Sequence, residues 1–184
     1  MKKAMWRAFL NYEKEEAWLN ALSAKGLAFE SYFLFRYAFA ESAPGAYIYR
    51  IELLERMPAH PESQEYLRFM AESGVEHIAS WGRWVYFRKK AADGPFDIYS
   101  DIDSRIAHYK RIWLLWMPIM VLDLAMGLNQ VLQGIGFLRE ENAVRWRCFV
   151  VGGLALGMGI LLLCSSLAIG KKIKRLRLER GLRE

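Results

Sequence analysis

The side chains that could do acid–base, metal or nucleophilic chemistry are few in this sequence and widely spaced. His60, His77 and His108 are isolated, and no His-x-x-x-His or Cys-x-x-Cys spacing indicates a zinc site. The stretch from Gly134 to Gly136 lacks the third glycine and the preceding strand of a dinucleotide-binding loop. Neither a P-loop nor a Gly-x-Ser-x-Gly motif occurs. We therefore expect a non-enzymatic protein without catalytic residues, metal or cofactor.

One ionisable residue has unusual surroundings. Asp123 lies near the middle of an apolar segment, residues 112–132, which also contains Asn129. A charged side chain at the centre of a membrane helix costs about 2.5–3.5 kcal/mol, and the aliphatic residues of the segment only about offset this cost. Two readings are equally weighted for Asp123: it meets a counterpart in a homo-oligomer or a polar group of another membrane protein, or it is protonated and bonded to a nearby backbone carbonyl.

A second apolar segment, residues 148–170, is rich in glycine. In an antiparallel hairpin its glycines lie level with the two polar residues of the first segment. Gly153 and Gly157 have the GxxxG spacing that lets another helix approach closely. The helix-packing positions that we expect are Gly152, Gly153, Gly157 and Gly159.

An aromatic segment with interspersed arginines could form a binding face. Its candidate residues are Trp81, Arg83, Trp84, Tyr86 and Arg88. Stacking platforms for ligands or bases combine aromatic rings and guanidinium groups in this way. The alternative is structural, and we favour it: in a strand, Trp84 and Tyr86 fill one face of a sheet while the residues that alternate with them fill the other.

Helical and strand periods alternate along the first 98 residues. Residues 12–25 and 62–73 have helical spacing, and Gly26 ends the first helix. Between them, Phe33, Phe35, Tyr37 and Phe39 alternate with other residues and should share one face of a strand. The expected order is β-α-β-β-β-α-β-β. This order predicts an α+β head, an antiparallel sheet with two helices, with a ferredoxin-like arrangement as one candidate topology.

Each of the two apolar segments reaches the roughly 20 residues that a helix needs to cross a bilayer. We therefore expect a two-helix transmembrane hairpin after the head. The predicted organisation is an α+β head (1–98), a juxtamembrane helix capped by Ser100 (99–111), a first transmembrane helix (112–132), a short extracytoplasmic loop (133–147), a second transmembrane helix (148–170) and a basic tail (171–184).

Basic residues predict the orientation of this hairpin. Ten Lys and Arg residues flank it on the side of the head and the tail, and three lie in the connecting loop. By the positive-inside rule, both termini of this multi-pass protein of the plasma membrane should be cytoplasmic. The tail residues expected to fix the topology or contact lipid are Lys171, Lys172, Lys174, Arg175 and Arg177.

The charge distribution argues against nucleic-acid binding. The net charge of +6 resides in residues 101–184, because residues 1–100 hold 13 basic and 13 acidic residues. A head without net positive charge lacks the electrostatic footprint of a nucleic-acid-binding domain. The two cysteines, Cys148 and Cys164, are about 24 Å apart along one helix, so they cannot form a disulfide with each other.

Several motifs in the first 110 residues occur together and in order. They are Tyr12-Glu13-Lys14-Glu15-Glu16, Trp18-Leu19-Asn20, Lys25-Gly26, Trp84-Val85-Tyr86-Phe87-Arg88-Lys89-Lys90, Asp93-Gly94-Pro95-Phe96 and Ser100-Asp101. In these motifs the chain resembles a bacterial membrane-protein family, domain of unknown function 2812. The resemblance implies membrane spans after the head. It also implies a cytoplasmic regulator as partner, because the family's genes often neighbour those of PadR-type transcriptional regulators. It implies no activity. Leu27 departs from the pattern, which has Trp after Lys25-Gly26, so a pocket lined by that Trp would be altered here.

Together these features predict a regulatory membrane protein whose cytoplasmic head binds a protein partner or a small ligand. The membrane helices would contact the lipid bilayer and a second copy or another membrane protein. The alternative is a subunit of a small transport or export complex, with Asp123 on a polar pathway.

Overall fold

The chain divides into two units. The computed structural model describes residues 3–99, 101–140 and 145–182. The first unit, the head, comprises Met1–Ser100, and the second, the hairpin, comprises Asp101–Glu184. This division lies within two residues of the predicted boundary of the head.

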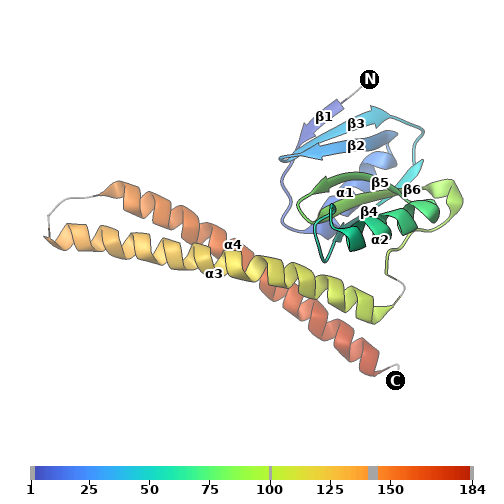
Figure 1. Cartoon of the computed structure of the whole chain (residues 1–184). Helices are drawn as coiled ribbons and strands as arrows, with labels where there is room; N and C mark the ends of the chain where they lie inside the picture. Colours follow the sequence, from blue (N-terminus) through green and yellow to red (C-terminus); the bar gives the residue numbers. More distant parts are fainter. Residues whose placement is uncertain (1–2, 100, 141–144, 183–184) are drawn as a thin grey trace. The chain divides into compact units, whose positions relative to one another are not determined.

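The head has the predicted order of elements. They are β1 (Lys3–Trp6), α1 (Tyr12–Ser23), β2 (Leu27–Phe33), β3 (Arg36–Glu41), β4 (Tyr47–Leu53), α2 (Pro61–Glu72), β5 (Glu76–Trp81), β6 (Trp84–Lys90) and a single 3-10 turn, Ala91–Asp93 (Figure 1). The predicted α+β class is therefore confirmed, and so is the hairpin of long apolar helices that follows it.

The strands form two antiparallel sheets rather than one. The order is β1-β3-β2 in the first sheet and β4-β6-β5 in the second. Each sheet is thus built from a β-α-β-β segment whose third strand is central. The second strand of each segment carries an irregularity at a similar place, between Phe29 and Ser31 in β2 and between His77 and Ala79 in β5. The head is therefore a structural duplication of one split β-α-β unit.

Two apolar clusters hold these layers together. Leu19 and Leu22 of α1 pack with Phe29, Tyr49 and other buried residues drawn from both sheets. A second cluster joins α2 to the second sheet. Helix α1 begins at Tyr12 because the Asn11 side chain accepts hydrogen bonds from two orphan N–H groups of the first turn.

The turn between β2 and β3 differs from the prediction. Tyr37 and Phe39 are buried, but Phe33 and Phe35 are 64% and 51% exposed, so the four rings do not share one face. The chain reverses at Leu34 and Phe35, whose φ angles are +42° and +66°. Such two-residue turns normally use Asn or Gly, because a side chain is strained at positive φ. Neither Leu34 nor Phe35 is typical of turns. The alternation of apolar residues therefore continues across the turn, and the sequence gives no sign that the strand ends there.

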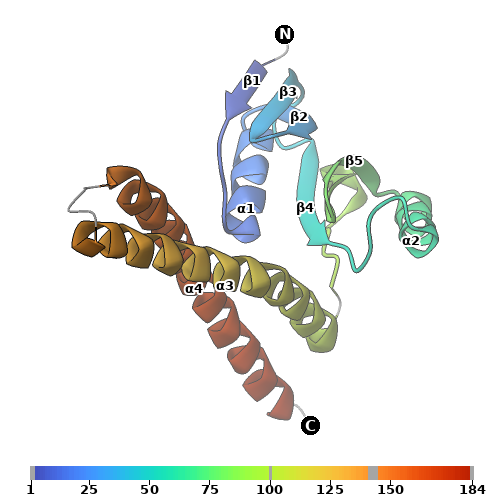
Figure 2. The same ribbon diagram turned by 60° about the vertical axis from the view of Figure 1, so that its left-hand side comes forward.

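The hairpin consists of α3 (Ile102–Glu140) and α4 (Trp146–Gly181), which lie side by side in Figures 1 and 2. The helices have 39 and 36 residues, so each is roughly 55 Å long. Each is therefore longer than its predicted transmembrane segment. Residues 133–140 of the predicted loop and most of the predicted tail (171–184) are helical.

Close packing explains why the helices continue beyond the apolar segments. At Gly134, a Cβ atom would lie 2.9 Å from the ring of Phe149, so the glycine lets α4 pack against α3 inside the predicted loop. At the N-terminus of α3, Asp101 caps the helix. The Asp101 carboxylate accepts a hydrogen bond of 2.7 Å from the Ser104 backbone N–H, whereas Ser100 lies outside the described residues.

Candidate functional site

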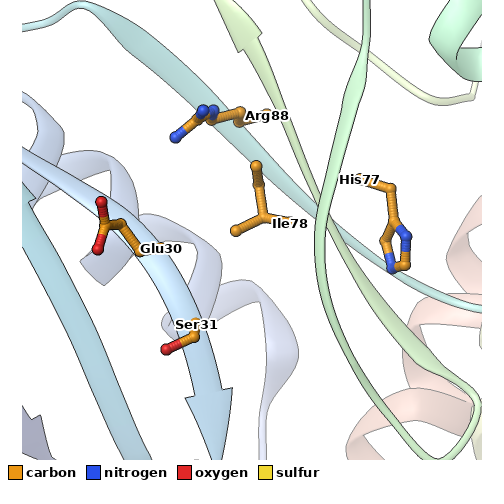
Figure 3. A pocket seen from close by; sticks show the side chains of 5 residues that line it. All are labelled: Glu30, Ser31, His77, Ile78 and Arg88. Atoms are coloured by element: carbon orange, nitrogen blue, oxygen red, sulfur yellow. The ribbon is translucent and has the colours of Figure 1, made fainter.

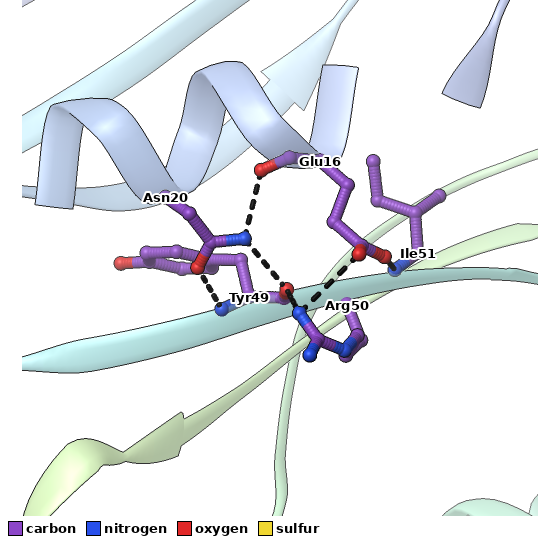
Figure 4. Close-up of polar contacts among 5 residues, drawn as sticks. All are labelled: Glu16, Asn20, Tyr49, Arg50 and Ile51. Atoms are coloured by element: carbon purple, nitrogen blue, oxygen red, sulfur yellow. Dashed lines mark hydrogen bonds and ion pairs between the residues drawn. The ribbon is translucent and has the colours of Figure 1, made fainter. Parts of the chain in front are cut away.

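Side chains of α1 cover the outer edge of β4. The Asn20 amide donates to the carbonyl oxygen of Tyr49 (3.0 Å) and accepts from its N–H (2.8 Å) (Figure 4). One turn earlier in α1, the Glu16 carboxylate accepts from the N–H of Ile51 at 3.0 Å. One turn later, the Ser23 hydroxyl donates to the carbonyl oxygen of Tyr47 at 2.6 Å. The helix thus takes the place of a neighbouring strand and closes this edge of the second sheet.

The edge strands β2 and β5, one from each sheet, are neighbours that, within the described residues, no helix covers in the way that α1 covers β4. β2 and β5 lie next to one another but belong to separate sheets. Between them lies an opening of about 450 Å³. It is lined by Glu30, Ser31, His77, Ile78 and Arg88 (Figure 3). Both strands are irregular here, since Glu30 and Ile78 are the residues at which their registers shift. Bulges of this kind end regular pairing and redirect side chains.

The two basic residues at this opening have defined partners, and the His77 imidazole points away from the side chains of Glu30, Ile78 and Arg88 (Figure 3). The Arg88 guanidinium binds the Glu76 carboxylate at 2.6 Å and lies 4.4 Å from the ring centroid of Tyr47. His77 Nε2 is 2.7 Å from the Ser80 hydroxyl and 3.1 Å from the carbonyl oxygen of Ala79. Burial lowers the pKa of His77, so the imidazole is neutral at pH 7.

A buried carboxylate connects the two sheets. The hydroxyls of Tyr37, on β3, and Tyr86, on β6, both donate to Glu15 Oε1 at 2.7 Å. Burial raises the pKa of Glu15, and the two hydrogen bonds oppose this shift. Because a buried polar group without a partner is costly, these bonds favour one mutual placement of the sheets.

Aromatic rings surround this carboxylate at the boundary between the sheets. The Tyr32 ring centroid lies 4.8 Å from that of Tyr37 and 5.3 Å from that of Tyr86. Tyr32 also contacts Trp81, at the end of β5, with a centroid separation of 6.1 Å. Trp81 is 41% exposed, so this row of rings reaches the surface.

The predicted aromatic and arginine residues have different environments. Tyr86 is buried, and Trp84 is half-buried against Tyr12. The Arg83 guanidinium donates to the carbonyl oxygen of Leu54 at 2.7 Å, away from the opening. Only Arg88 lines the opening, and only Trp81 is largely exposed. Side chains of β6 alternate between the two faces of the sheet, as expected if they fill the core: Tyr86 belongs to the first cluster and Phe87 to the second. The five residues therefore do not form one continuous face.

Sequence reasoning missed Glu15 as a candidate. The available signal was a carboxylate on the same helical stripe as Trp18 and Leu19. A charged residue in an apolar stripe needs a buried partner. The sequence could not name the partners, because Tyr37 and Tyr86 lie 22 and 71 positions away.

The glycines of α4 fall into two groups. A Cβ atom at Gly152 would lie 2.9 Å from Val131, and one at Gly159 would lie 2.7 Å from Leu124, so both glycines lie against α3. A Cβ atom at Gly153 or Gly157 would meet nothing within 4 Å. Within the hairpin, close packing therefore uses Gly152 and Gly159. The packing role of Gly153 and Gly157 stays a prediction that concerns a helix from outside this chain.

Two polar residues of the first apolar segment, Asp123 and Asn129, differ in how far they are buried. Asp123 is half-buried and Asn129 is exposed. Over residues 3–99, 101–140 and 145–182, no hydrogen bond or ion pair involves the side chain of either residue. The described residues of the hairpin therefore offer the Asp123 carboxylate no polar partner.

The basic tail is the last part of α4. Arg180 binds the Asp103 carboxylate of α3 at 2.8 Å, and the Lys172 ammonium lies 5.5 Å from the ring centroid of Tyr109. The predicted lipid-contact residues Lys171, Lys174 and Arg175 belong to the same helical stretch. The tail is thus paired with the start of α3.

Comparison with known proteins gave one result. The model of a family described as "Protein of unknown function (DUF2812)" matches residues 11–121, which include most of the head and about the first half of α3. No curated protein and no solved structure matches the chain.

Proposed function

The chain belongs to the DUF2812 family, and we propose that it is a non-enzymatic membrane protein whose head binds a small ligand in the opening between β2 and β5. Ligand binding would serve a regulatory role by changing how the protein associates with a partner. The proposal combines a membrane anchor with a soluble binding domain. Each part is supported by separate observations.

The exposure of the two long helices supports the anchor. The most apolar stretch of each is only 17% buried, unlike the core helix of a soluble protein. Leu114, Leu122 and Leu154 are 63%, 69% and 71% exposed. Apolar side chains that project outward over such a length are suited to lipid. The ten basic residues beside the head and the tail favour a plasma-membrane topology with both termini in the cytoplasm.

The opening between the sheets is the observation that carries the ligand-binding role. Its volume of about 450 Å³ is within the usual range of small-molecule sites. Glu30 and Arg88 supply opposite charges, and Ile78 supplies apolar surface. Polar groups of this kind can orient a small ligand that carries its own charge.

The environment of His77 supports a non-enzymatic role. In the tautomer with the proton on Nε2, the imidazole donates to the carbonyl oxygen of Ala79 at 3.1 Å. In this tautomer Nε2 cannot take the proton of the Ser80 hydroxyl, although the two atoms are 2.7 Å apart. The pair consequently lacks the base that an activated serine requires.

Association within the membrane would use the outer face of α4. Gly153 and Gly157 leave open space there, in which a helix of a second copy or of another membrane protein fits closely. A cytoplasmic regulator is the further partner that the family's gene neighbourhood suggests.

The ligand site is tested by thermal shift of the full chain in detergent against a panel of small charged metabolites. Ser31→Trp places a large ring in the opening and should abolish the shift caused by any hit. Ser73→Trp is the matched control, because Ser73 is exposed and does not line the opening. Equal binding by both variants contradicts the site. The anchor is tested separately by extraction of membranes at alkaline pH, since a peripheral protein would be released.

A further inference from the structure

A second pocket lies within the hairpin, between the first turns of α3 and the last turns of α4. Its volume is about 500 Å³. It is lined by Asp103, Ile106, Ala107 and Lys110 of α3 and by Arg177 and Arg180 of α4. Three cationic side chains from two helices thus face one space together with one carboxylate.

The charges in this pocket favour an anion. Asp103 is already bound by Arg180 at 2.8 Å, through one nitrogen of the guanidinium. A guanidinium has five N–H donors, so Arg180 can bind more than one acceptor at a time. Lys110 and Arg177 supply two further positive charges. Arginine in particular forms paired hydrogen bonds with phosphate oxygens.

The position of the pocket along the helices indicates the source of the anion. Lys110 precedes the apolar segment that begins at Ile112 by two residues, or about 3 Å of helix. Arg177 follows Gly170 by seven residues, or about 10 Å. The headgroup layer extends roughly 5–8 Å beyond the hydrocarbon on each side. With the apolar segments in the bilayer, as proposed above, Lys110 lies within the headgroup layer, whereas the Arg177 backbone lies just beyond it and the long side chain can reach back to the layer.

We propose that this pocket binds the phosphate group of an anionic phospholipid. Lys110, Arg177 and Arg180 contact the phosphate oxygens. This site differs from a diffuse attraction between a basic tail and a membrane. Lys171, Lys174 and Arg175 are in the same helix but do not line the pocket.

The test compares two triple variants of the full chain in detergent. One is Lys110→Gln, Arg177→Gln and Arg180→Gln. The control is Lys171→Gln, Lys174→Gln and Arg175→Gln, which removes the same charge outside the pocket. Native mass spectrometry measures binding of dioctanoyl phosphatidylglycerol. The site predicts binding about tenfold weaker in the first variant and nearly unchanged in the control. Equal loss in both variants overturns the proposal, because diffuse attraction explains it.

Two further measurements separate the remaining explanations. Inorganic phosphate and dioctanoyl phosphatidylcholine are titrated against the wild-type protein. Preference for phosphatidylglycerol over both supports a lipid site, whereas inorganic phosphate binding as tightly overturns the assignment to a lipid. Asp103→Asn removes the competing charge and keeps an oxygen acceptor for Arg180, so it should tighten lipid binding. Weaker binding in this variant contradicts the site. Alkaline extraction of the same variants reports membrane insertion independently. A failure of the proposed membrane anchor can therefore be distinguished from a failure of the proposed lipid site.

Discussion

Tyr37 and Tyr86 donate hydrogen bonds to the same oxygen, Oε1 of Glu15, and both bonds are 2.7 Å long. The two tyrosines belong to different sheets, and Glu15 belongs to the helix that packs against both. No ladder of backbone hydrogen bonds joins β2 to β5, so the two halves of the head are linked through side chains: this contact, and the bonds from Asn20, Glu16 and Ser23 of α1 to β4. Of these links, the Glu15 carboxylate is the one that joins the central strands of the two sheets, β3 and β6.

Replacing Glu15 tests this connection. Glu15→Gln keeps an oxygen acceptor for both hydroxyls and should cost less than about 1 kcal/mol of stability. Glu15→Leu leaves both buried hydroxyls without that acceptor and should cost about 2–4 kcal/mol. Chemical denaturation of the full chain in detergent, followed by tryptophan fluorescence, measures the difference. Equal destabilisation by the two substitutions would show that the shared acceptor is not what stabilises the contact.

The same residue predicts a pH dependence. The pKa of Glu15 is raised by burial, so the folded state holds this proton more tightly than the unfolded chain does. Its contribution to stability is therefore fully present below the ordinary pKa of about 4.5 and is lost as pH rises through the folded-state value. Relative to Glu15→Gln, the wild-type protein should become less stable over this range. A difference that stays constant with pH would contradict the predicted direction of the shift.

The strained turn between β2 and β3 offers a stabilising substitution. Leu34 and Phe35 both have positive φ, which costs about 1 kcal/mol or more for each such residue. Leu34→Asn with Phe35→Gly supplies the residues that this turn prefers and should raise stability by about 1 kcal/mol. Thermal unfolding measures the gain. Leu10→Asn, at another exposed apolar residue, is the control for lost surface hydrophobicity. A loss of stability in the turn variant would mean that the two exposed side chains stabilise the head more than the strain destabilises it.

The features that the sequence predicts correctly depend on local patterns. Alternating apolar residues and helical stripes follow from which faces are buried, and they predicted the order of the head's elements and its α+β class. The two apolar segments likewise predicted the hairpin. The division into two sheets depends instead on which strands pair, and pairs such as β1 with β3 or β4 with β6 are distant in sequence.

Polar contacts between distant residues were equally beyond prediction. The Asn20 amide binds the backbone of Tyr49, 29 positions away. The sequence around Asn20 would look the same if this amide faced solvent, so the contact could not be predicted. The turn at Leu34 was missed for the opposite reason. Its residues break the usual turn chemistry, so the local signal was misleading rather than absent.

Two adjacent glycines in α4 form a matched pair of variants. Gly152→Ala would place a methyl group 2.9 Å from Val131 and 3.0 Å from the Gly127 carbonyl oxygen, so α3 and α4 must separate. Gly153→Ala meets nothing within 4 Å inside the hairpin, so in the monomeric protein it should be neutral or stabilise the helix by up to about 1 kcal/mol. Thermal unfolding of the full chain in detergent compares the two. If Gly153→Ala instead disrupts the hairpin, the packing of α4 on α3 differs from the one described here.

Asp123 distinguishes an assembly role from a transport role. Its carboxylate has no hydrogen bond or ion pair within the described part of the chain, so a partner outside the chain could supply one. If Asp123 holds copies together, Asp123→Leu and Asp123→Asn should both reduce cross-linked dimers in membranes, the leucine variant more strongly. If it lies on a polar pathway in a transport complex, Asp123→Asn should abolish flux while cross-linking stays intact. Asn129→Leu is the control, because Asn129 is a neutral, exposed residue of the same helix. A strictly monomeric wild-type protein that Asp123→Leu leaves unchanged would exclude the assembly role.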